Sequence, residues 1–540
     1  MIPSVKTPAA VGQFELGDSF EPIELGSSSD GSPYASALLL ARRDGENLGL
    51  VRVVPRDGVL EPDELRAAFD EQLPGWDGES HRRLAVPRDC HVTVIVTARG
   101  RHQALAATLD SLFDCEWGSF DVVVVDSGTD AGSADFLRER FGAHPQLRCV
   151  EEPREGVSFA RNTGLSVAQG EIVAFTDEGT EVDEGWIRAL VAALEETGAD
   201  CVTGPALPLE LETHAQTLVA GLTGSANEST SRTLSLADNA AEWLVVRVAE
   251  QLGPGLNAAV RADTLRALGG FDPALGPGTV ARGAEDLDLY IRLLQAGHAV
   301  GFQPDAVVWR RLPRELQAAK RAAFARGMSI GVAISKHVHD GNKLAVELRA
   351  AARHIRRRAA RPGNQRRTHL ETRALMGLIA APVAYSQSVR AQARLPAGPE
   401  RPTVLLEPPP APAPVSLMPD EARPVTPRWA DVSLAALIAA AVGVALVPVP
   451  AAARIVVTFV AACLVPGGAL IRYLRLDFGA SWLAMATALS LAVETLASLA
   501  LIWTGWWHPA LVAIALGAIS ALIIVFDWSR HRGAGPALPA

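Results

Sequence analysis

Polar side chains stand at the ends of three short apolar runs in the first half of the chain. They are Thr97, Asp126 and Asp177. Such runs are typical of strands buried on both faces of a sheet. Ligands of open α/β sheets bind at the carboxyl ends of the strands. We therefore expect these side chains to meet at one polar binding site, where the carboxylates can accept hydrogen bonds or hold a cation.

A second acidic group, Glu285-Asp286, stands where the glycine-containing loop 278–283 gives way to a helical pattern. A carboxylate there can act as a general base that takes the proton from an attacking hydroxyl. The alternative is that Asp286 is a helix-start acid favoured by the helix dipole. Taken alone, Asp286 fits the second explanation better.

Alternating strand and helix patterns connect these residues. Apolar runs predict strands at 92–96, 121–125, 147–150 and 171–175, and helical spacing predicts helices at 104–113, 134–141, 158–168 and 185–195. This alternation is typical of a parallel, doubly wound α/β sheet. The turn after the first run reads TARGR (97–101), without the G-x-G-x-x-G loop of dinucleotide enzymes, and the sequence contains no P-loop. The pattern argues against a dehydrogenase and against a P-loop kinase.

The composition argues against other classes of protein. The 540 residues carry a formal net charge of −10, which offers no global basic field for nucleic acid. The five cysteines are scattered, which indicates a reduced compartment without a disulfide framework. Residues 1–33 lack the basic start and apolar run of a signal peptide. Arginine dominates the basic residues, which indicates a bacterial source.

The segment 92–309 resembles glycosyltransferase family 2, whose members are inverting enzymes. The resemblance rests on several motifs in order. They are VTVIVTARGR (92–101), VVVVDSGTD (122–130), ARNTGL (160–165), EIVAFTDEG (171–179), VTGPALPLELET (202–213), NAAVRADTLRALGGFD (257–272) and GAEDLDLYIRLLQAGH (283–298). The resemblance implies a GT-A type fold, which is a Rossmann-like mixed α/β sheet.

The resemblance also implies roles for individual residues. Asp286 matches the catalytic base of the family's acidic pair, with Glu285 beside it. Asp126 matches the aspartate that binds the nucleotide base, and Asp177 begins the D-x-D segment that binds ribose, metal and diphosphate. The expected donor-binding residues are Thr97, Arg99, Asp126, Arg161, Asn162, Asp177, Glu178 and Arg310.

Two departures from the family pattern concern the metal. The D-x-D segment reads Asp177-Glu178-Gly179, and the family's V-W-H segment ends in Arg310 and Arg311 instead of histidine. Asp177 and Glu178 are the expected ligands of a magnesium or manganese ion. The alternatives are that Glu181 replaces the lost carboxylate or that the site works without tight metal binding.

The arginines have open interpretations as well. Arg310 and Arg311 can pair with diphosphate oxygens, because guanidinium binds phosphate bidentately. They can equally be surface residues. Lost activity is a third possibility, which the intact Glu285-Asp286 pair opposes.

The rest of the chain divides by composition. Residues 1–88 predict a small α+β module, with strands at 35–42 and 48–54 and a helix at 61–72. The catalytic domain spans 89–340. Residues 341–395 predict a basic helical segment, which is either a solvated helix face or, as the following apolar stretches favour, a helix on an anionic lipid surface. Residues 396–430 predict a proline-rich linker.

Four apolar stretches follow within 431–528, at 432–449, 454–471, 479–502 and 509–526. Each approaches the length that spans a bilayer. Flanking arginines predict cytosolic termini, including the tail 529–540. The sequence thus predicts an all-α transmembrane region and a multi-pass protein of the inner membrane. Glu494, inside the third stretch, is either functional or a protonated bundle residue.

The leading interpretation is an enzyme. It moves a sugar from a nucleotide-sugar donor to a membrane-associated glycan or lipid-linked acceptor in cell-envelope biosynthesis. The alternative is a catalytically degenerate, nucleotide-sugar-binding scaffold in a glycan-assembly complex. A transporter built on the four apolar stretches has only one central carboxylate, Glu494, in its support.

Overall fold

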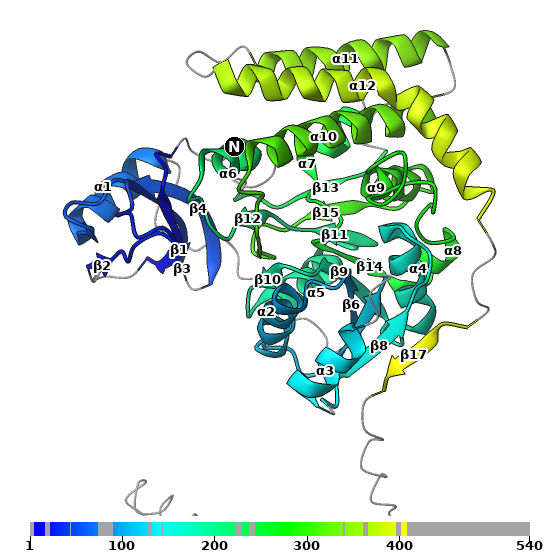
Figure 1. Ribbon diagram of the computed structural model, residues 1–540, viewed down its shortest axis with the longest axis horizontal. Helices are drawn as coiled ribbons and strands as arrows, with labels where there is room; N and C mark the ends of the chain where they lie inside the picture. The colour runs from blue at the N-terminus through cyan, green and yellow to red at the C-terminus, as the bar shows by residue number, and fades with distance from the viewer. Residues whose placement is uncertain are drawn as a thin grey trace, which may run out of the picture. The chain divides into compact units, whose positions relative to one another are not determined.

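The computed structural model describes residues 5–16, 22–43, 45–73, 90–127, 132–142, 144–221, 229–236, 244–338, 341–359, 365–395 and 401–407. Within these residues one large sheet has nine strands in the order β13-β15-β11-β14-β9-β6-β7-β8-β17 (Figure 1). The strands are β6 (Val92–Ala98), β7 (Phe120–Asp126), β8 (Leu147–Glu151), β9 (Ile172–Asp177), β11 (Cys201–Thr203), β13 (Arg232–Leu234), β14 (Ala258–Arg261), β15 (Val300–Phe302) and β17 (Thr403–Leu406).

The centre of the sheet is parallel and its flanks are mixed. Strands β9, β6, β7 and β8 run parallel, whereas β14 is antiparallel to both β9 and β11. The parallel part carries the strands predicted from the apolar runs, and those predictions are confirmed. The mixed sheet agrees with the expected GT-A-like α/β fold.

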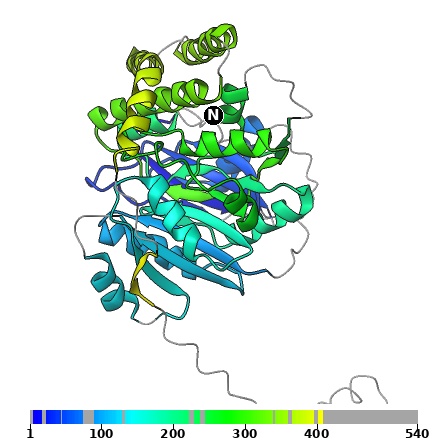
Figure 2. The same ribbon diagram turned by 90° about the vertical axis from the view of Figure 1, so that its right-hand side faces the viewer.

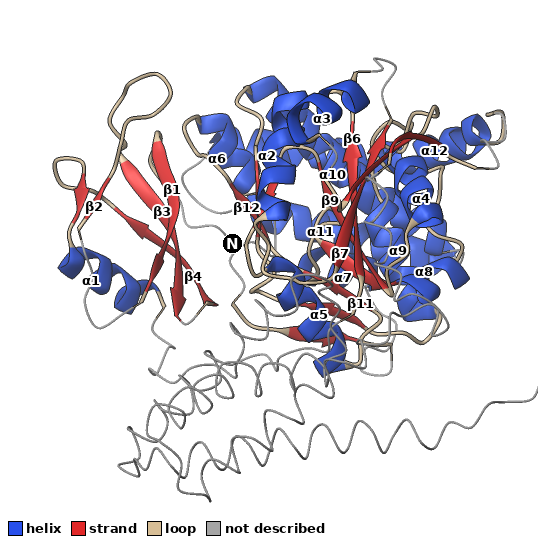
Figure 3. Cartoon of the chain, turned by 90° about the horizontal axis from the view of Figure 1, so that it is seen from below, coloured by secondary structure: helices blue, strands red, loops and turns tan. Residues whose placement is uncertain are grey.

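Both faces of the sheet are covered by helices (Figure 3). Ile95 and Phe175 belong to one apolar core, and Val94 and Ala174 to the other, because successive side chains of a strand point to opposite faces. The helices in the second core are α2 (His102–Phe113), α3 (Ser133–Phe141) and α5 (Trp186–Thr197). The first core includes α4 (Val157–Val167), α7 (Leu244–Gln251), α8 (Ala262–Ala267), α9 (Glu285–Gln295) and α10 (Leu316–His337). The four helices predicted between 104 and 195 are confirmed.

A second, small sheet lies beside the central one. It joins β10 (Thr180–Val182), β16 (Val308–Arg310) and β12 (Ala206–Pro208) in the order β10-β16-β12. Its register places Thr180 opposite Arg310. Arg310 is thereby fixed next to the turn that follows Asp177.

The N-terminal module is a three-stranded sheet with a helix. Its strands β1 (Ala9–Glu15), β3 (Ser36–Arg43) and β4 (Glu46–Val53) are accompanied by β2 (Ile23–Glu24), β5 (Val59–Leu60) and α1 (Pro62–Gln72). The two strands and the helix predicted there are confirmed; β1, β2 and β5 were not predicted. One sheet face packs on α1. The other shares an apolar core with the catalytic part, in which Leu38 and Leu40 join Leu211 and Val307.

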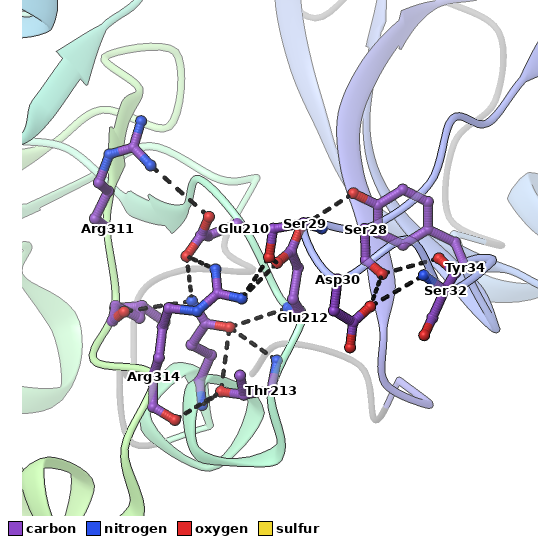
Figure 4. A network of polar contacts seen from close by, with 12 residues as sticks. Ser28, Ser29, Asp30, Ser32, Tyr34, Glu210, Glu212, Thr213, Arg311 and Arg314 are labelled. Atoms are coloured by element: carbon purple, nitrogen blue, oxygen red, sulfur yellow. Dashed lines mark hydrogen bonds and ion pairs between the residues drawn. The ribbon is translucent and has the colours of Figure 1, made fainter.

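Polar contacts fasten the module to the catalytic part (Figure 4). Glu212 accepts hydrogen bonds from the Ser29 backbone N–H at 2.9 Å, from the Ser29 hydroxyl and from Arg314 Nη2 at 2.6 Å. Arg314 also donates to Glu210 at 2.9 Å. Separately, Arg42 binds both oxygens of Asp183, at 3.0 and 2.8 Å. We name the group Ser29, Glu210, Glu212 and Arg314 the docking network.

Two further helices, α11 (Gly341–Ala359) and α12 (Gln365–Gln392), lie together with α10 (Figure 2). Glycines let α10 and α12 approach closely, because a Cβ at Gly327 would come within 1.8 Å of the Ala374 carbonyl oxygen. Because α11 and α12 occupy most of residues 341–395, the predicted basic segment is largely helical. Its contact with anionic lipid stays a prediction. Part of the predicted linker 396–430 is a strand instead, since β17 pairs with β8.

The membrane predictions require correction. Among the residues that the structure describes, no helix is both long enough and apolar enough to cross a bilayer. The four predicted spans, the tail 529–540 and Glu494 lie outside the described residues. The predictions of an all-α transmembrane region and of a multi-pass localisation at the inner membrane are therefore wrong by the helices that the structure describes. The domain boundaries and the bacterial source stay predictions.

Candidate active site

The carboxyl edge of the central strands brings the first group of predicted residues together. The register pairs Thr97 with Asp177 across β6 and β9, and Ala98 with Asp126 across β6 and β7. The Thr97 hydroxyl donates to Asp177 Oδ1 at 2.7 Å. Two of these buried strands, β7 and β9, therefore end with a carboxylate at the same edge of the sheet, as the sequence predicted.

The start of α9 supplies the second acidic group. Ala284, directly before Glu285, has φ of 76°, a left-handed conformation that is unfavourable for a residue with a side chain. Glu285 is buried, whereas Asp286 is half-buried. The Gly255 N–H donates to Asp286 Oδ2 at 3.1 Å. This bond fixes the direction of the Asp286 carboxylate.

Gly255 is also needed for space. A Cβ at this position would lie 2.8 Å from Asp286 Cβ and 3.0 Å from Arg161 Nη1. Only a residue without a side chain lets the backbone approach both groups this closely. Gly255 is thus a positioning residue that the motif analysis did not select, although it stands in a Gly-Pro-Gly run at 253–255.

Arg161 on α4 lies between the two acidic groups. Its side chain is 2% exposed, with Nη2 3.5 Å from Asp177 Oδ1 and Nη1 3.6 Å from Glu285 Oε1. Arg161 Nε and Nη1 have no hydrogen-bond partner within the described residues. Burial opposes the charge of Arg161, but Asp177, Glu285 and Asp286 outweigh it and raise its pKa. We name Arg161, Asp177, Glu285 and Asp286 the carboxylate cluster.

Burial and neighbouring charge alter the titration of Glu285. Burial, followed by the charge of Asp286, raises the pKa of Glu285, while Arg161 opposes the shift. Adjacent carboxylates in a poorly solvated site do not ionise together easily. Glu285 therefore keeps its proton to higher pH than an exposed glutamate. The Tyr290 hydroxyl lies buried near this group without a hydrogen-bond partner among the described residues, and sequence reasoning missed it.

The Glu178 carboxylate faces Arg101, whereas the Asp177 carboxylate faces Thr97 and Arg161. Its carboxylate is 3% exposed and pairs with Arg101 Nε at 2.9 Å, and it also accepts from the Arg101 N–H at 3.2 Å. Gly179 follows with φ of 85° and donates its N–H to the Thr108 hydroxyl. Arg101 belongs to the quoted TARGR run, but nothing local in the sequence reveals its pairing with Glu178.

Arg310 lies opposite Thr180, beside the turn that follows Asp177. Burial lowers the pKa of the Arg310 guanidinium, the charge of Asp177 opposes this shift and the charge of Arg101 adds to it. Arg311 points elsewhere: its guanidinium lies 3.7 Å from Glu181 and 3.7 Å from Glu210. Of the two predicted arginines, only Arg310 is placed with Asp177.

Two expected donor-binding residues have other partners. The Asn162 amide clamps Phe271, with its Nδ2 donating to the Phe271 carbonyl and its Oδ1 accepting from the Phe271 N–H, both at 2.8 Å. Arg99 is exposed and pairs with Glu155 at 2.7 Å. Within the described part of the chain, neither side chain has a hydrogen bond or ion pair to the carboxylate cluster, and their donor-binding roles stay predictions.

Comparison with known proteins supports the type of domain. Residues 93–220 match the family Glycosyl transferase family 2. Pre-mycofactocin glycosyltransferase of Mycobacterium tuberculosis is 29% identical over 275 residues, which cover 49% of this chain and 53% of the relative. The succinoglycan biosynthesis protein ExoM of Rhizobium meliloti is 28% identical over 251 residues, covering 44% of this chain and 74% of the relative.

The chain thus spans about half the length of the mycobacterial relative. Among solved structures, the mannosyltransferase PcManGT from Pyrobaculum calidifontis in complex with GDP-Man and Mn²⁺ has a TM-score of 0.37 and 20% identity, and the match covers 58% of this chain and 90% of that one. By the family match and the named relatives, the chain contains a glycosyltransferase domain of family 2.

Proposed function

We propose that this protein is an inverting glycosyltransferase that transfers a sugar from a nucleotide-sugar donor to an acceptor hydroxyl. The observation that carries the proposal is the carboxylate cluster. Asp177 at the carboxyl end of β9 and Glu285, which precedes Asp286 at the start of α9, are linked through Arg161 at one edge of the sheet. The family match supports the same assignment.

Asp286 is the base in this mechanism. It is half-buried and its Oδ2 is oriented by the Gly255 N–H, so it can face an acceptor. The acceptor oxygen attacks the anomeric carbon as Asp286 takes its proton, and the bond to the diphosphate oxygen breaks on the opposite side. Glu285 is a positioning residue, since its buried carboxyl holds Arg161 in place.

Asp177 and Asp126 form the donor side. Their position at the ends of β9 and β7 is where α/β sheets bind nucleotides. Asp126 is assigned to the nucleotide base and Asp177 to the ribose side, as the family pattern implies. The names of the relatives support two acceptor classes, a pre-mycofactocin-like compound and a polysaccharide precursor.

A donor screen tests the proposal. Purified protein is incubated with UDP-, GDP-, dTDP-, CDP- and ADP-sugars, and nucleoside diphosphate release is measured with and without candidate acceptors. Acceptor-dependent release from at least one donor, abolished in Asp286→Asn, is the expected result. Binding of a nucleotide sugar without release of nucleoside diphosphate across the whole panel would instead favour the scaffold function. One observation favours that alternative: Glu178, an expected metal ligand, is bound by Arg101.

A further inference from the structure

The residues at the donor side do not fit a divalent cation. Magnesium and manganese sites in nucleotide enzymes use one or two carboxylates together with phosphate oxygens. Glu178 is occupied by Arg101 and buried away from the edge. Gly179 offers no side chain. Within the described part of the chain, no three His, Cys, Asp or Glu residues cluster in a way that could hold a metal.

Asp177 alone remains, which is the smallest number of carboxylates such a site uses, and its Oδ1 is already engaged. That oxygen accepts from the Thr97 hydroxyl at 2.7 Å and lies 3.5 Å from Arg161 Nη2. Glu181 does not replace the missing ligand. It stands opposite Trp309 in the β10–β16 register, so its side chain leaves the sheet on the face away from Arg310, and it pairs with Arg311.

Arginine stands where the counter-charge is needed. Arg310 is fixed on β16 opposite Thr180, and Thr180 stands three residues after Asp177 in the chain. Within the described residues no hydrogen bond or ion pair engages its guanidinium, whereas Arg101 is held by Glu178 and Arg311 by Glu181 and Glu210. Arg310 is thus a half-buried cation whose fork of donors is available for a ligand anion.

The conformation of the turn agrees with this arrangement. The Arg101 guanidinium lies over Gly179, since a Cβ on Gly179 would be 3.5 Å from Arg101 Nη1. Arg101 also donates to the Glu178 carbonyl at 2.9 Å, so three hydrogen bonds hold the turn through one arginine. The turn that would carry a metal in the family's D-x-D pattern is here closed by a cation.

We propose that this transferase binds its nucleoside diphosphate without a divalent cation and that Arg310 supplies the counter-charge to the leaving diphosphate. The inference rests on the proposed function. When the anomeric C–O bond breaks, its electron pair passes to the diphosphate oxygen and adds one negative charge there, while the acceptor proton goes to Asp286. A bidentate guanidinium stabilises that charge through charge-assisted hydrogen bonds.

Binding of nucleoside diphosphates alone tests this without turnover. The full chain and Arg310→Gln are freed of metal with EDTA and titrated calorimetrically with UDP, GDP, CDP, ADP and dTDP. Each titration is run with and without manganese at about 1 mM, which exceeds the dissociation constants of ordinary divalent-cation sites. The wild type should bind one of them equally well, within about twofold, in both conditions. Arg310→Gln should bind it at least about tenfold more weakly, the scale of losing one charge-assisted contact.

Arg188→Gln is the matched control. Arg188 is a half-exposed arginine on α5 paired with Glu116, and its substitution should leave nucleotide affinity unchanged. Gly179→Asp provides a gain of function: aspartate tolerates positive φ better than most residues, and it adds the oxygen ligand that the turn lacks. Manganese should strengthen the binding of the nucleoside diphosphate to the Gly179→Asp variant and not to the wild type.

The outcomes separate this inference from the proposed function. Binding that requires manganese in the wild type overturns the metal-free site and leaves the transferase assignment intact. Metal-free binding that Arg310→Gln does not weaken overturns the role of Arg310. Failure of every nucleotide to bind, with and without manganese, overturns the proposed function itself.

Discussion

The carboxylate cluster and the docking network are both built around an arginine with acidic neighbours, and they differ in how well the polar groups are satisfied. In the docking network, Arg314 donates to Glu210 at 2.9 Å and to Glu212 at 2.6 Å. In the cluster, Arg161 lies 3.5 and 3.6 Å from its carboxylates, and two of its nitrogens lack hydrogen-bond partners among the described residues.

Burial makes this difference informative. Arg161 is 2% exposed, whereas the Arg314 side chain is 44% exposed. A buried, incompletely paired cation is costly, and native proteins tolerate such groups where they serve a ligand or a reaction. The docking network has the close geometry of a structural contact. The comparison therefore predicts that changes in the cluster lower activity, and that changes in the network lower stability.

Substitution of the base should have the largest effect. Asp286→Asn can keep only one of the two backbone hydrogen bonds that Asp286 accepts, from the Gly255 N–H or the Leu287 N–H, and it cannot take the acceptor proton. Turnover should therefore fall by at least about a hundredfold, the scale of general base catalysis. Steady-state sugar transfer and the urea midpoint of unfolding measure the two effects separately. Turnover within a few-fold of the wild type would remove Asp286 from the mechanism.

Gly255→Ala should have the next largest effect. The added Cβ would lie 2.8 Å from Asp286 Cβ and must displace it, and misplacing a reacting group by about 1 Å lowers rates by up to about a hundredfold. We expect kcat to fall more than donor affinity. Gly185→Ala is the control, because its nearest neighbours lie 3.8 Å away. Equal kinetics of the two variants would show that Gly255 does not position Asp286.

Local patterns in the sequence were sufficient for the strand ends and insufficient for the pairings. Thr97 and Asp177 could be placed because buried apolar runs define where β6 and β9 end. The bond between Arg101 and Glu178 spans 77 positions and depends on the packing of α2 beside β10, which no local period encodes. For the same reason the pairing of β17 with β8 lay beyond the sequence argument.

Breaking the docking network should reduce stability and leave the chemistry unchanged. Glu212→Gln removes the charge that Ser29 and Arg314 address, and we expect a loss of about 1 kcal/mol in the free energy of unfolding, because the pair is partly exposed. Urea denaturation measures it, with Asp263→Asn as a control at an ion pair whose carboxylate is fully exposed. A stable variant with reduced kcat would contradict the separation of the two regions.

The smallest effect is a difference in how stability responds to pH. A hydrogen bond from Ser29, opposed by burial and reinforced by Arg314, lowers the pKa of Glu212 from 4.5 to about 2. Since its folded-state pKa is lowered, the stabilisation by Glu212 is present above pH 4.5 and is lost as the pH falls towards 2. The stability gap between the wild type and Glu212→Gln should therefore narrow in acid.

Glu285 should show the opposite slope. Burial raises its folded-state pKa, so its contribution is complete below the unfolded value of 4.5 and is lost as the pH rises through the folded-state pKa. Glu285→Gln, which mimics the protonated group, should gain stability relative to the wild type as the pH rises above 4.5. Thermal unfolding of both variants between pH 3 and 9 (about the usual range of native stability) measures the two slopes. If the stability difference between wild type and variant changed with pH in the same direction for both residues, Glu285 would be as well paired as Glu212. Incomplete pairing would then not distinguish the carboxylate cluster from the docking network.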